Sequence, residues 1–202
     1  MYRAEEAGLP DLRGHGDGDG DRICLAYNET ADTKAVTEYV KATYTDIPDI
    51  VTGLSMGGGV AIRSIGENGD IDALITLSAY SSVQDFMGWQ FSRFITPVLA
   101  YPVKLTKALY AGLKFGVNGF NATPLESIGN LHGRPALMMH SRKDSQVPFI
   151  CFEKLTKKAA TVSNDIRTYI VEGDEHFITG SFGMPEEDKA YNSVLLEFVR
   201  NV

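Results

Sequence analysis

The amino-acid sequence predicts an α/β protein, with a mostly parallel β-sheet flanked by helices. Two observations lead to this prediction. Short runs of strand length are apolar nearly throughout, as expected of strands that are buried on both faces. Between and after these runs, apolar residues recur at helical spacing. Strand–helix alternation of this kind is typical of a parallel sheet with helices on both of its faces.

Four apolar runs are the predicted strands, at residues 47–54, 71–79 (IDALITLSA), 135–140 (PALMMH) and 166–171 (IRTYIV). A glycine-rich turn after the first run leads into a predicted helix that contains Val60, Ala61 and Ile62. Helical spacing also predicts helices over residues 30–44, 149–160 and 185–202. In the last of these, one face carries Tyr191, Val194, Leu195, Phe198 and Val199.

Length and composition are those of one globular domain, residues 1–202, with 44% hydrophobic and 22% charged residues. A net charge of −7 without a basic cluster argues against binding to nucleic acid or to an anionic membrane. Cys24 and Cys151 lie in unrelated contexts without a CxxC motif, which favours free cytosolic thiols. The sequence has neither an apolar run of roughly 20 residues nor the apolar core of a signal peptide. We therefore expect a cytoplasmic protein.

The run Gly53-Leu54-Ser55-Met56-Gly57 has the pattern G-x-S-x-G. In serine hydrolases this pattern forms a sharp strand-to-helix turn that lifts the serine hydroxyl above the sheet. The bare pattern is short and weak evidence, and a purely structural turn is the alternative. Here a predicted strand precedes it and a predicted helix follows it, so we predict Ser55 as a nucleophile.

This turn makes further demands on its residues. Ser55 should have a positive φ. Strand and helix must also approach closely, which requires small residues two before and two after the serine; Gly53 and Gly57 meet that need, and Gly58 and Gly59 extend the contact. The backbone N–H of Met56, at the helix N-terminus, should stabilise a developing oxyanion.

A serine hydroxyl is a weak nucleophile until a base removes its proton and an acid orients that base. In hydrolases with this turn, the chain order is serine, then acid, then histidine. Three histidines follow Ser55. His176 lies in a polar turn after the last predicted strand, whereas His140 ends a buried strand and His132 precedes that strand. We therefore predict His176 as the base.

Asp144 is the best-placed candidate for the acid, in a short loop after the predicted strand 135–140. The alternatives Glu172, Asp174 and Glu175 lie so close to His176 in sequence that they are poorly placed to orient its ring. Asp174 would more naturally cap the segment that follows it.

Four segments resemble, in order, landmarks of the α/β-hydrolase family, most closely its bacterial esterases and serine-aminopeptidase-like members. They are DLRGHG at 11–16, GLSMGG at 53–58, PALMMHSRKDSQVP at 135–148 and GDEHF at 173–177. The resemblance implies an α/β-hydrolase fold with Ser55 as nucleophile, Asp144 as acid and His176 as base. Ser141 stands where the family usually has glycine, without an evident consequence for the chemistry.

A larger departure concerns the N-terminus. In the family, three strands and a loop that carries the first oxyanion donor precede DLRGHG, but only ten residues precede Asp11 here. The missing third strand would pair with the strand that leads to Ser55, so that strand should have an open edge. We expect either an N-terminally truncated fragment, or a chain whose open edge is covered by a second copy or another chain.

Residues 83–120 do not follow the strand–helix rhythm. We predict an insertion of short helices that either packs onto the domain or forms an aromatic cap over the active site. Its aromatic residues are Phe86, Trp89, Phe91, Phe94, Tyr101, Tyr110, Phe115 and Phe120, interrupted by Pro97 and Pro102.

The sequence therefore predicts a serine hydrolase that acts on a small-molecule ester, thioester or amide through an acyl-enzyme. It implies no metal and no organic cofactor. Asp17, Asp19 and Asp21 imitate the start of a calcium loop, but glycine and glutamate are missing from the sixth and twelfth positions. Three alternatives stay open: a peptidase, an acyltransferase and a non-catalytic binding module of the same fold.

Overall fold

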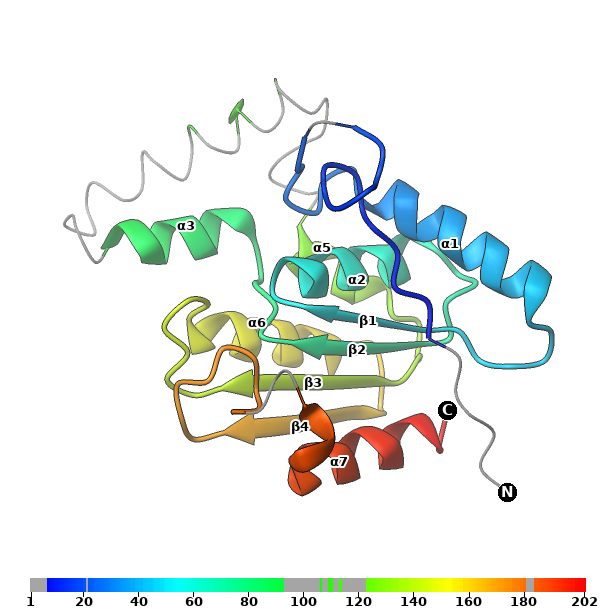
Figure 1. The fold of residues 1–202 in the computed structure, drawn as a ribbon. Coiled ribbons are helices and arrows are strands. Elements are labelled where there is room, and N and C mark those ends of the chain that lie inside the picture. The colour runs from blue at the N-terminus through cyan, green and yellow to red at the C-terminus, as the bar shows by residue number, and fades with distance from the viewer. Residues whose placement is uncertain are drawn as a thin grey trace.

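A computed structural model of the chain describes residues 7–20, 22–92, 106, 109, 110, 113, 123–180 and 184–202. Its centre is a four-stranded parallel sheet in the order β1-β2-β3-β4 (Figure 1). The predicted α/β class with a parallel sheet is confirmed. The strands are β1 (Ile50–Leu54), β2 (Ala73–Leu77), β3 (Ala136–Ser141) and β4 (Ile166–Val171).

β4 has the predicted bounds, whereas β1 and β2 are shorter than the apolar runs that contain them. Pro48 has no backbone N–H for a ladder, and the Asp49 N–H donates to the Asp72 carboxylate (2.8 Å) instead, so β1 begins only at Ile50. β2 ends at Leu77 because Ser78, with φ +49°, leaves the extended conformation.

The helices follow the strands largely as predicted. The long ones are α1 (Thr30–Thr43), α2 (Met56–Glu67), α3 (Val83–Ser92), α6 (Phe149–Ala159) and α7 (Lys189–Val199), with α5 (Pro124–Ser127), η1 (Ile128–Asn130) and η2 (Pro185–Glu187) as short turns. The predicted helix 185–202 is divided at Asp188, whose side chain accepts a hydrogen bond from the Tyr191 N–H and so starts α7 afresh.

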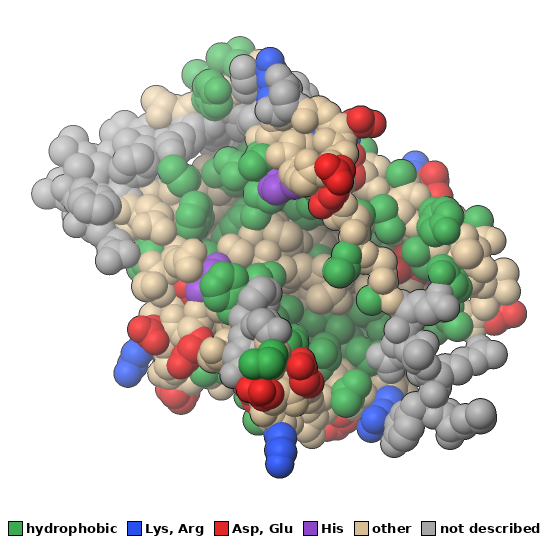
Figure 2. Space-filling model, viewed as in Figure 1, with side chains coloured by type: hydrophobic (Ala, Val, Ile, Leu, Met, Phe, Trp, Pro, Cys, Tyr) green, Lys and Arg blue, Asp and Glu red, His purple; other side chains and the backbone are tan. Residues whose placement is uncertain are grey.

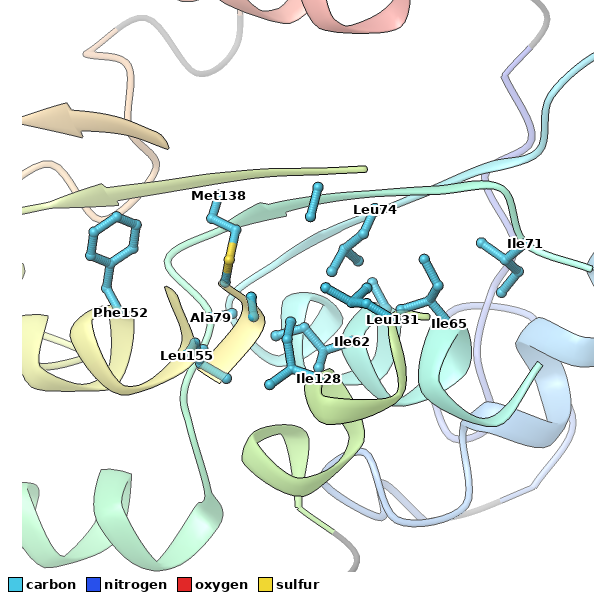
Figure 3. Close-up of a cluster of buried hydrophobic side chains, with 13 residues drawn as sticks. Ile62, Ile65, Ile71, Leu74, Ala79, Ile128, Leu131, Met138, Phe152 and Leu155 are labelled. Atoms are coloured by element: carbon cyan, nitrogen blue, oxygen red, sulfur yellow. The ribbon is translucent and has the colours of Figure 1, made fainter. Parts of the chain in front are cut away.

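Two apolar cores lie on opposite faces of the sheet, because successive residues of a strand point to opposite faces. On one face, Leu74 and Met138 pack with Ile62 and Ile65 of α2 and Leu155 of α6 (Figure 3). On the other face, neighbours of these strand residues pack against Phe198 of α7. Helices therefore cover both faces, as the apolar strands predict.

β1 lies at the edge of the described sheet, with β2 as its one neighbour. Its residues are mostly only half-buried and Thr52 is exposed, whereas every residue of β2 is buried. In the described part of the chain, the strand that leads to Ser55 thus has the open edge expected from the sequence.

On the face seen in Figure 2, hydrophobic side chains gather towards the middle and acidic side chains lie around the margin.

None of the helices within the described residues is long and apolar enough to cross a membrane.

Candidate active site

The candidate catalytic residues lie where the strands of the sheet end. Because all four strands are parallel, their carboxyl ends lie together (Figure 1), and we call this end of the sheet its carboxyl-end sheet edge. Ser55 follows β1 directly, Asp144 lies in the loop after β3, and His176 lies in the loop after β4. Ladder contacts continue past the strand ends, with the Ser55 N–H donating to the Leu77 carbonyl (2.8 Å). The three segments are therefore brought together by the topology of the sheet.

Ser55 has the backbone conformation that the motif predicts, with φ +53° and ψ −113°. It is the residue before α2, and its carbonyl accepts the first helical hydrogen bond, from the Gly59 N–H (3.1 Å). A positive φ is unfavourable for a residue with a side chain and persists only where its surroundings enforce it. The short turn between a buried sheet and a packed helix supplies that enforcement.

Gly53 is required for this turn. A Cβ atom at Gly53 would lie 2.0 Å from the carbonyl oxygen of Gly57, far inside any real contact distance. Gly58 and Gly59 extend the close contact as expected, since their Cβ atoms would lie 2.8 Å from Ala79 Cβ and 2.9 Å from the Tyr80 ring.

The expectation that Gly57 must also be small is wrong. A Cβ atom at Gly57 would meet nothing within 4 Å among the described atoms. The strand approaches the backbone of Gly57, and the missing side chain of Gly57 would point away from that contact. The motif holds two glycines, but only the one in the strand is required for close packing.

Met56 is the first residue of α2. The first N–H groups of a helix have no acceptor within the helix and carry the positive end of its dipole. The Met56 side chain packs against a buried cluster formed by Tyr80, Val147 and Cys151. The predicted oxyanion donor is thus a helix N-terminal amide held beside Ser55.

Asp144 and His176 are in direct contact. His176 Nδ1 lies 2.8 Å from Asp144 Oδ2, and the two residues are only 6% and 4% exposed. An ionised carboxylate can only accept, so Nδ1 donates the hydrogen bond, and in the neutral form of the ring Nε2 is left as an acceptor. This is the tautomer that a general base needs.

The other carboxylate oxygen fixes the direction of Asp144. Its Oδ1 accepts hydrogen bonds from the backbone N–H groups of Gln146 (2.7 Å) and Val147 (2.9 Å). Burial alone raises the pKa of Asp144, but the hydrogen bonds from His176 and these two amides outweigh burial and hold the pKa below its usual range. Asp144 is therefore ionised at neutral pH.

None of His132, His140 and Asp174 takes part in the direct contact between His176 and Asp144. His140 is 1% exposed, and its Nε2–H donates to the Val147 carbonyl (3.0 Å), which supports the loop of Asp144 from below. Burial lowers the pKa of His140 and keeps its ring neutral. His132 is exposed in a turn before β3, at the opposite end of the sheet. Asp174 is exposed, beside the buried His176.

Ser55 and His176 are joined through Ser78. Leu77, which accepts the Ser55 N–H, is followed by Ser78, whose Oγ–H donates to the His176 carbonyl (2.6 Å). Within the described residues, no direct hydrogen bond connects the Ser55 hydroxyl to His176. Such catalytic contacts often tighten only when substrate is bound.

Residues 172–178 form the loop that carries His176, which we call the base loop. Two serines without a predicted role contact this loop. Ser78 binds the His176 carbonyl, and the Ser141 Oγ–H donates to the Glu175 carbonyl. Both serines are fully buried. The only signal in the sequence is that Ser141 stands where the resemblance implies glycine.

Part of the predicted cap, residues 83–120, can be followed. α3 opens it, and Phe86 packs near the Tyr80 ring, with centroids 6.0 Å apart. Tyr110 is exposed. Phe94, Tyr101, Phe115 and Phe120 lie outside the described residues, as does the side chain of Phe91.

The described residues hold no group of three or more His, Cys, Asp or Glu arranged to bind a metal ion. Asp17 and Asp19 are exposed, and Asp21 lies outside the described residues.

The fold and the geometry of its sheet edge define the class of α/β-hydrolases. A family model described as serine aminopeptidase, S33, matches residues 7–122, more than half of the chain. The chain therefore belongs to this family. The match includes Ser55 but ends before Asp144 and His176, so the positions of these two residues are seen only in the structure.

Two solved structures illustrate the fold likeness. Esterase Pf2001 of Pyrococcus furiosus superposes with a TM-score of 0.67 at 20% identity, covering 94% of this chain and 68% of that one. The esterase domain of a Rhodothermus marinus protein gives a TM-score of 0.56 at 17% identity, covering 84% of this chain and 69% of that one. No curated protein shows a significant match in sequence.

Proposed function

We propose that this chain is a cytoplasmic serine hydrolase that cleaves carboxylic esters, thioesters or small amides through an acyl-enzyme. One observation carries the proposal: the buried 2.8 Å contact between His176 and Asp144 lies at the same sheet edge as Ser55, whose φ is positive. This arrangement leaves His176 Nε2 able to take a proton from a serine hydroxyl. The two buried, unpaired thiols, Cys24 and Cys151, support the cytoplasmic assignment.

In the proposed mechanism, Ser55 Oγ attacks the carbonyl carbon of the ester while its proton passes to His176 Nε2. The carbonyl oxygen becomes an oxyanion that accepts a hydrogen bond from the Met56 N–H. When this intermediate collapses, the bond to the alcohol oxygen breaks and His176 gives its proton to the leaving alcohol. Water then attacks the acyl group, His176 takes a proton from it, and the carboxylic acid leaves as the proton returns to Ser55.

Asp144 supports both halves of the reaction. It stays ionised, holds His176 in the required tautomer and stabilises the imidazolium that forms in each step. Its fixed position is supported by the amides of Gln146 and Val147.

The rate should be modest, because Met56 is the one oxyanion donor assigned to the described residues. Loss of one donor typically costs about 10²–10³-fold in kcat. We expect turnover of p-nitrophenyl acetate to be slower by about this factor than in an α/β-hydrolase with two donors. Equal turnover by the two proteins would contradict the assignment of a single donor.

A fluorophosphonate probe tests the proposal directly, because it labels a serine only where a base activates it. We expect one adduct, located on Ser55 by mass spectrometry and lost in Ser55→Ala. The matched control is Ser64→Ala, which alters a buried serine of α2 and should leave labelling unchanged. Labelling that survives Ser55→Ala would refute the site. An unlabelled but folded wild-type protein would favour a non-catalytic binding module.

The choice between ester and peptide substrates needs its own measurement, because fold and triad do not decide it. The matching family is described as serine aminopeptidase, whereas the two similar structures above are esterases. We favour esters, since they are the commoner substrates of this fold. The expected result is faster release of p-nitrophenol from p-nitrophenyl acetate than of p-nitroaniline from aminoacyl p-nitroanilides, and the reverse order would favour a peptidase. Acyl transfer would appear as faster release when an added alcohol competes with water.

A further inference from the structure

Two buried serine hydroxyls hold consecutive carbonyl groups of the base loop. Ser78, at the end of β2, donates to the carbonyl of His176 itself, with 2.6 Å between the oxygens. Ser141, the last residue of β3, donates to the carbonyl of Glu175. Both serines are 0% exposed, so water cannot replace either hydroxyl without a rearrangement. The backbone of the candidate base is thus fixed from two neighbouring strands.

Ser78 combines a strained backbone conformation with a hydrogen bond to the candidate base. Its φ of +49° lies in the left-handed region, which costs free energy for any residue except glycine. Glycine would remove that cost but would also remove the donor to His176. A residue held in a strained conformation, with its one polar atom on the candidate base, points to a positioning role.

The base loop is also attached to the loop of Asp144 near its start. The Arg142 N–H donates to the Val171 carbonyl (2.7 Å), and the Lys143 N–H donates to the Gly173 carbonyl (3.0 Å). These two contacts join the loops where they leave the sheet. The two serines contact residues 175 and 176, later in the base loop. They therefore fix the backbone that determines the position of the His176 ring.

On its other side, the base loop is anchored in the core. The Ile178 N–H donates to the Glu175 carbonyl (3.1 Å), the same oxygen that Ser141 binds, and this closes a turn around His176. Ile178 is 2% exposed and packs in the core beneath α7. The turn is thus fixed by the apolar packing of Ile178 as well as by the two hydroxyls.

We propose that Ser78 and Ser141 are positioning residues that hold His176 in contact with Asp144. The inference rests on the proposed function, in which His176 is the base. Neither serine hydroxyl bonds to the Asp144 carboxylate or to the His176 ring; each hydroxyl fixes a carbonyl of the base loop. The Ser141 carbonyl in addition accepts the Asp144 N–H (3.2 Å), a backbone contact that Ser141→Ala leaves in place. Ser141 gains a role by this inference, because the glycine that the resemblance implies at its position could not donate to Glu175.

The test compares Ser78→Gly and Ser141→Ala with Ser64→Ala. Ser78→Gly suits a positive φ, so its loss of function would reflect the missing hydroxyl rather than backbone strain. Ser64 is equally buried, but its hydroxyl has no hydrogen-bond partner among the described residues, so Ser64→Ala measures the cost of altering a buried serine alone. Ser141→Thr, which keeps a hydroxyl at a strand position, should restore much of what Ser141→Ala loses.

Two readouts separate positioning from general stability. We expect kcat for p-nitrophenyl acetate to fall about 10-fold to 100-fold in Ser78→Gly and Ser141→Ala, with KM nearly unchanged, because a small displacement of a catalytic group costs this much. We also expect the proton NMR signal of His176 Nδ1–H, observed with ¹⁵N-labelled histidine, to broaden or disappear. In Ser64→Ala both readouts should match the wild type.

The inference is overturned if Ser78→Gly and Ser141→Ala keep the wild-type NMR signal and kcat, even when their melting temperatures fall. The NMR readout does not need an active enzyme. A wild-type protein that resists fluorophosphonate would end the proposed function, whereas the Nδ1–H signal would still decide whether the two hydroxyls hold His176 in contact with Asp144.

Discussion

The nucleophile turn and the base loop face the same sheet edge but are built in different ways. The turn is made by the seven neighbouring residues 53–59, and its shape comes from backbone packed against backbone, with no room for a Cβ at Gly53. The base loop is held by side chains from other strands, Ser78 and Ser141, and by a carboxylate in a third loop, Asp144.

Because the two halves of the site are held differently, we expect substitutions in them to have different effects. The repulsion energy between backbone atoms rises steeply as they approach, so the turn should tolerate no added atom at its closest point. Hydrogen bonds contribute about 1 kcal/mol each and can be lost one at a time. We expect changes in the turn to act on folding, and changes around the base loop to act on catalysis.

The largest effect on stability should follow Gly53→Ala. The new Cβ would lie 2.0 Å from the Gly57 carbonyl oxygen, so β1 and α2 would have to separate. Overpacking typically costs 1–3 kcal/mol, and a clash with backbone should reach about 3 kcal/mol or more. Urea unfolding measures the loss, which we expect to appear as a much lower midpoint or as insoluble protein.

Gly57→Ala is the matched control, because it changes the other glycine of the same motif. Its Cβ would meet nothing within 4 Å, and alanine favours a helix over glycine by up to about 1 kcal/mol. We expect stability equal to or above that of the wild type. If both variants lose stability equally, the close contact does not depend on Gly53 alone and the comparison fails.

The next effect concerns the base loop, through Asp144→Asn. The asparagine can still accept the amides of Gln146 and Val147, but an NH₂ group turned towards His176 favours the wrong tautomer. A change of this kind lowers kcat on the order of 10⁴-fold. Kinetics with p-nitrophenyl acetate, or the rate of fluorophosphonate labelling where turnover is too slow, measure the loss.

Asp174→Asn supplies the control, since Asp174 lies two residues from His176 but is exposed. It should retain wild-type kinetics. A large loss in Asp174→Asn with little loss in Asp144→Asn would mean that the acid is assigned to the wrong carboxylate.

The same contrast explains how much could be predicted from the sequence. Order along the chain and apolar runs were enough for the parallel sheet, for β4 with its bounds and for the loops that carry Asp144 and His176, because these features depend on local pattern. The positive φ of Ser55 followed from its motif. Gly57 was misjudged because a motif weights both glycines alike, whereas the direction of each missing side chain depends on three-dimensional packing.

Ser78 and Ser141 could not be found in this way. Ser78 lies 98 residues from His176 in the chain, and a buried serine at a strand end has no pattern that distinguishes a donor from a packing residue. Their contacts exist only because β2, β3 and β4 end side by side. Long-range hydrogen bonds of single hydroxyls are thus the part of this site that required a structure.

The smallest expected effect is a pH dependence that only the base-loop side should have. The pKa of Asp144 is raised by burial but lowered further by its hydrogen bonds, so in the folded protein it lies below that of an unfolded aspartate, about 3.9. The carboxylate therefore stabilises the fold fully above that pH and loses its contribution as the pH falls through the folded pKa. Burial lowers the pKa of His140, which lies 3.7 Å from Asp144, and the Asp144 charge partly opposes that shift, so Asp144→Asn should lower the pKa of His140 further.

Urea unfolding of the wild type and Asp144→Asn at several pH values tests this prediction. At pH 7 the variant should be less stable by about 2 kcal/mol, the scale of charge-assisted hydrogen bonds. The difference should stay constant down to about pH 5 and shrink below about pH 4. Gly57→Ala alters no ionisable group, so its curve should run parallel to that of the wild type. A difference between Asp144→Asn and the wild type that persists unchanged at pH 3 would mean that Asp144 stabilises the loop by shape rather than by charge, and the base loop would then resemble the turn more than we infer.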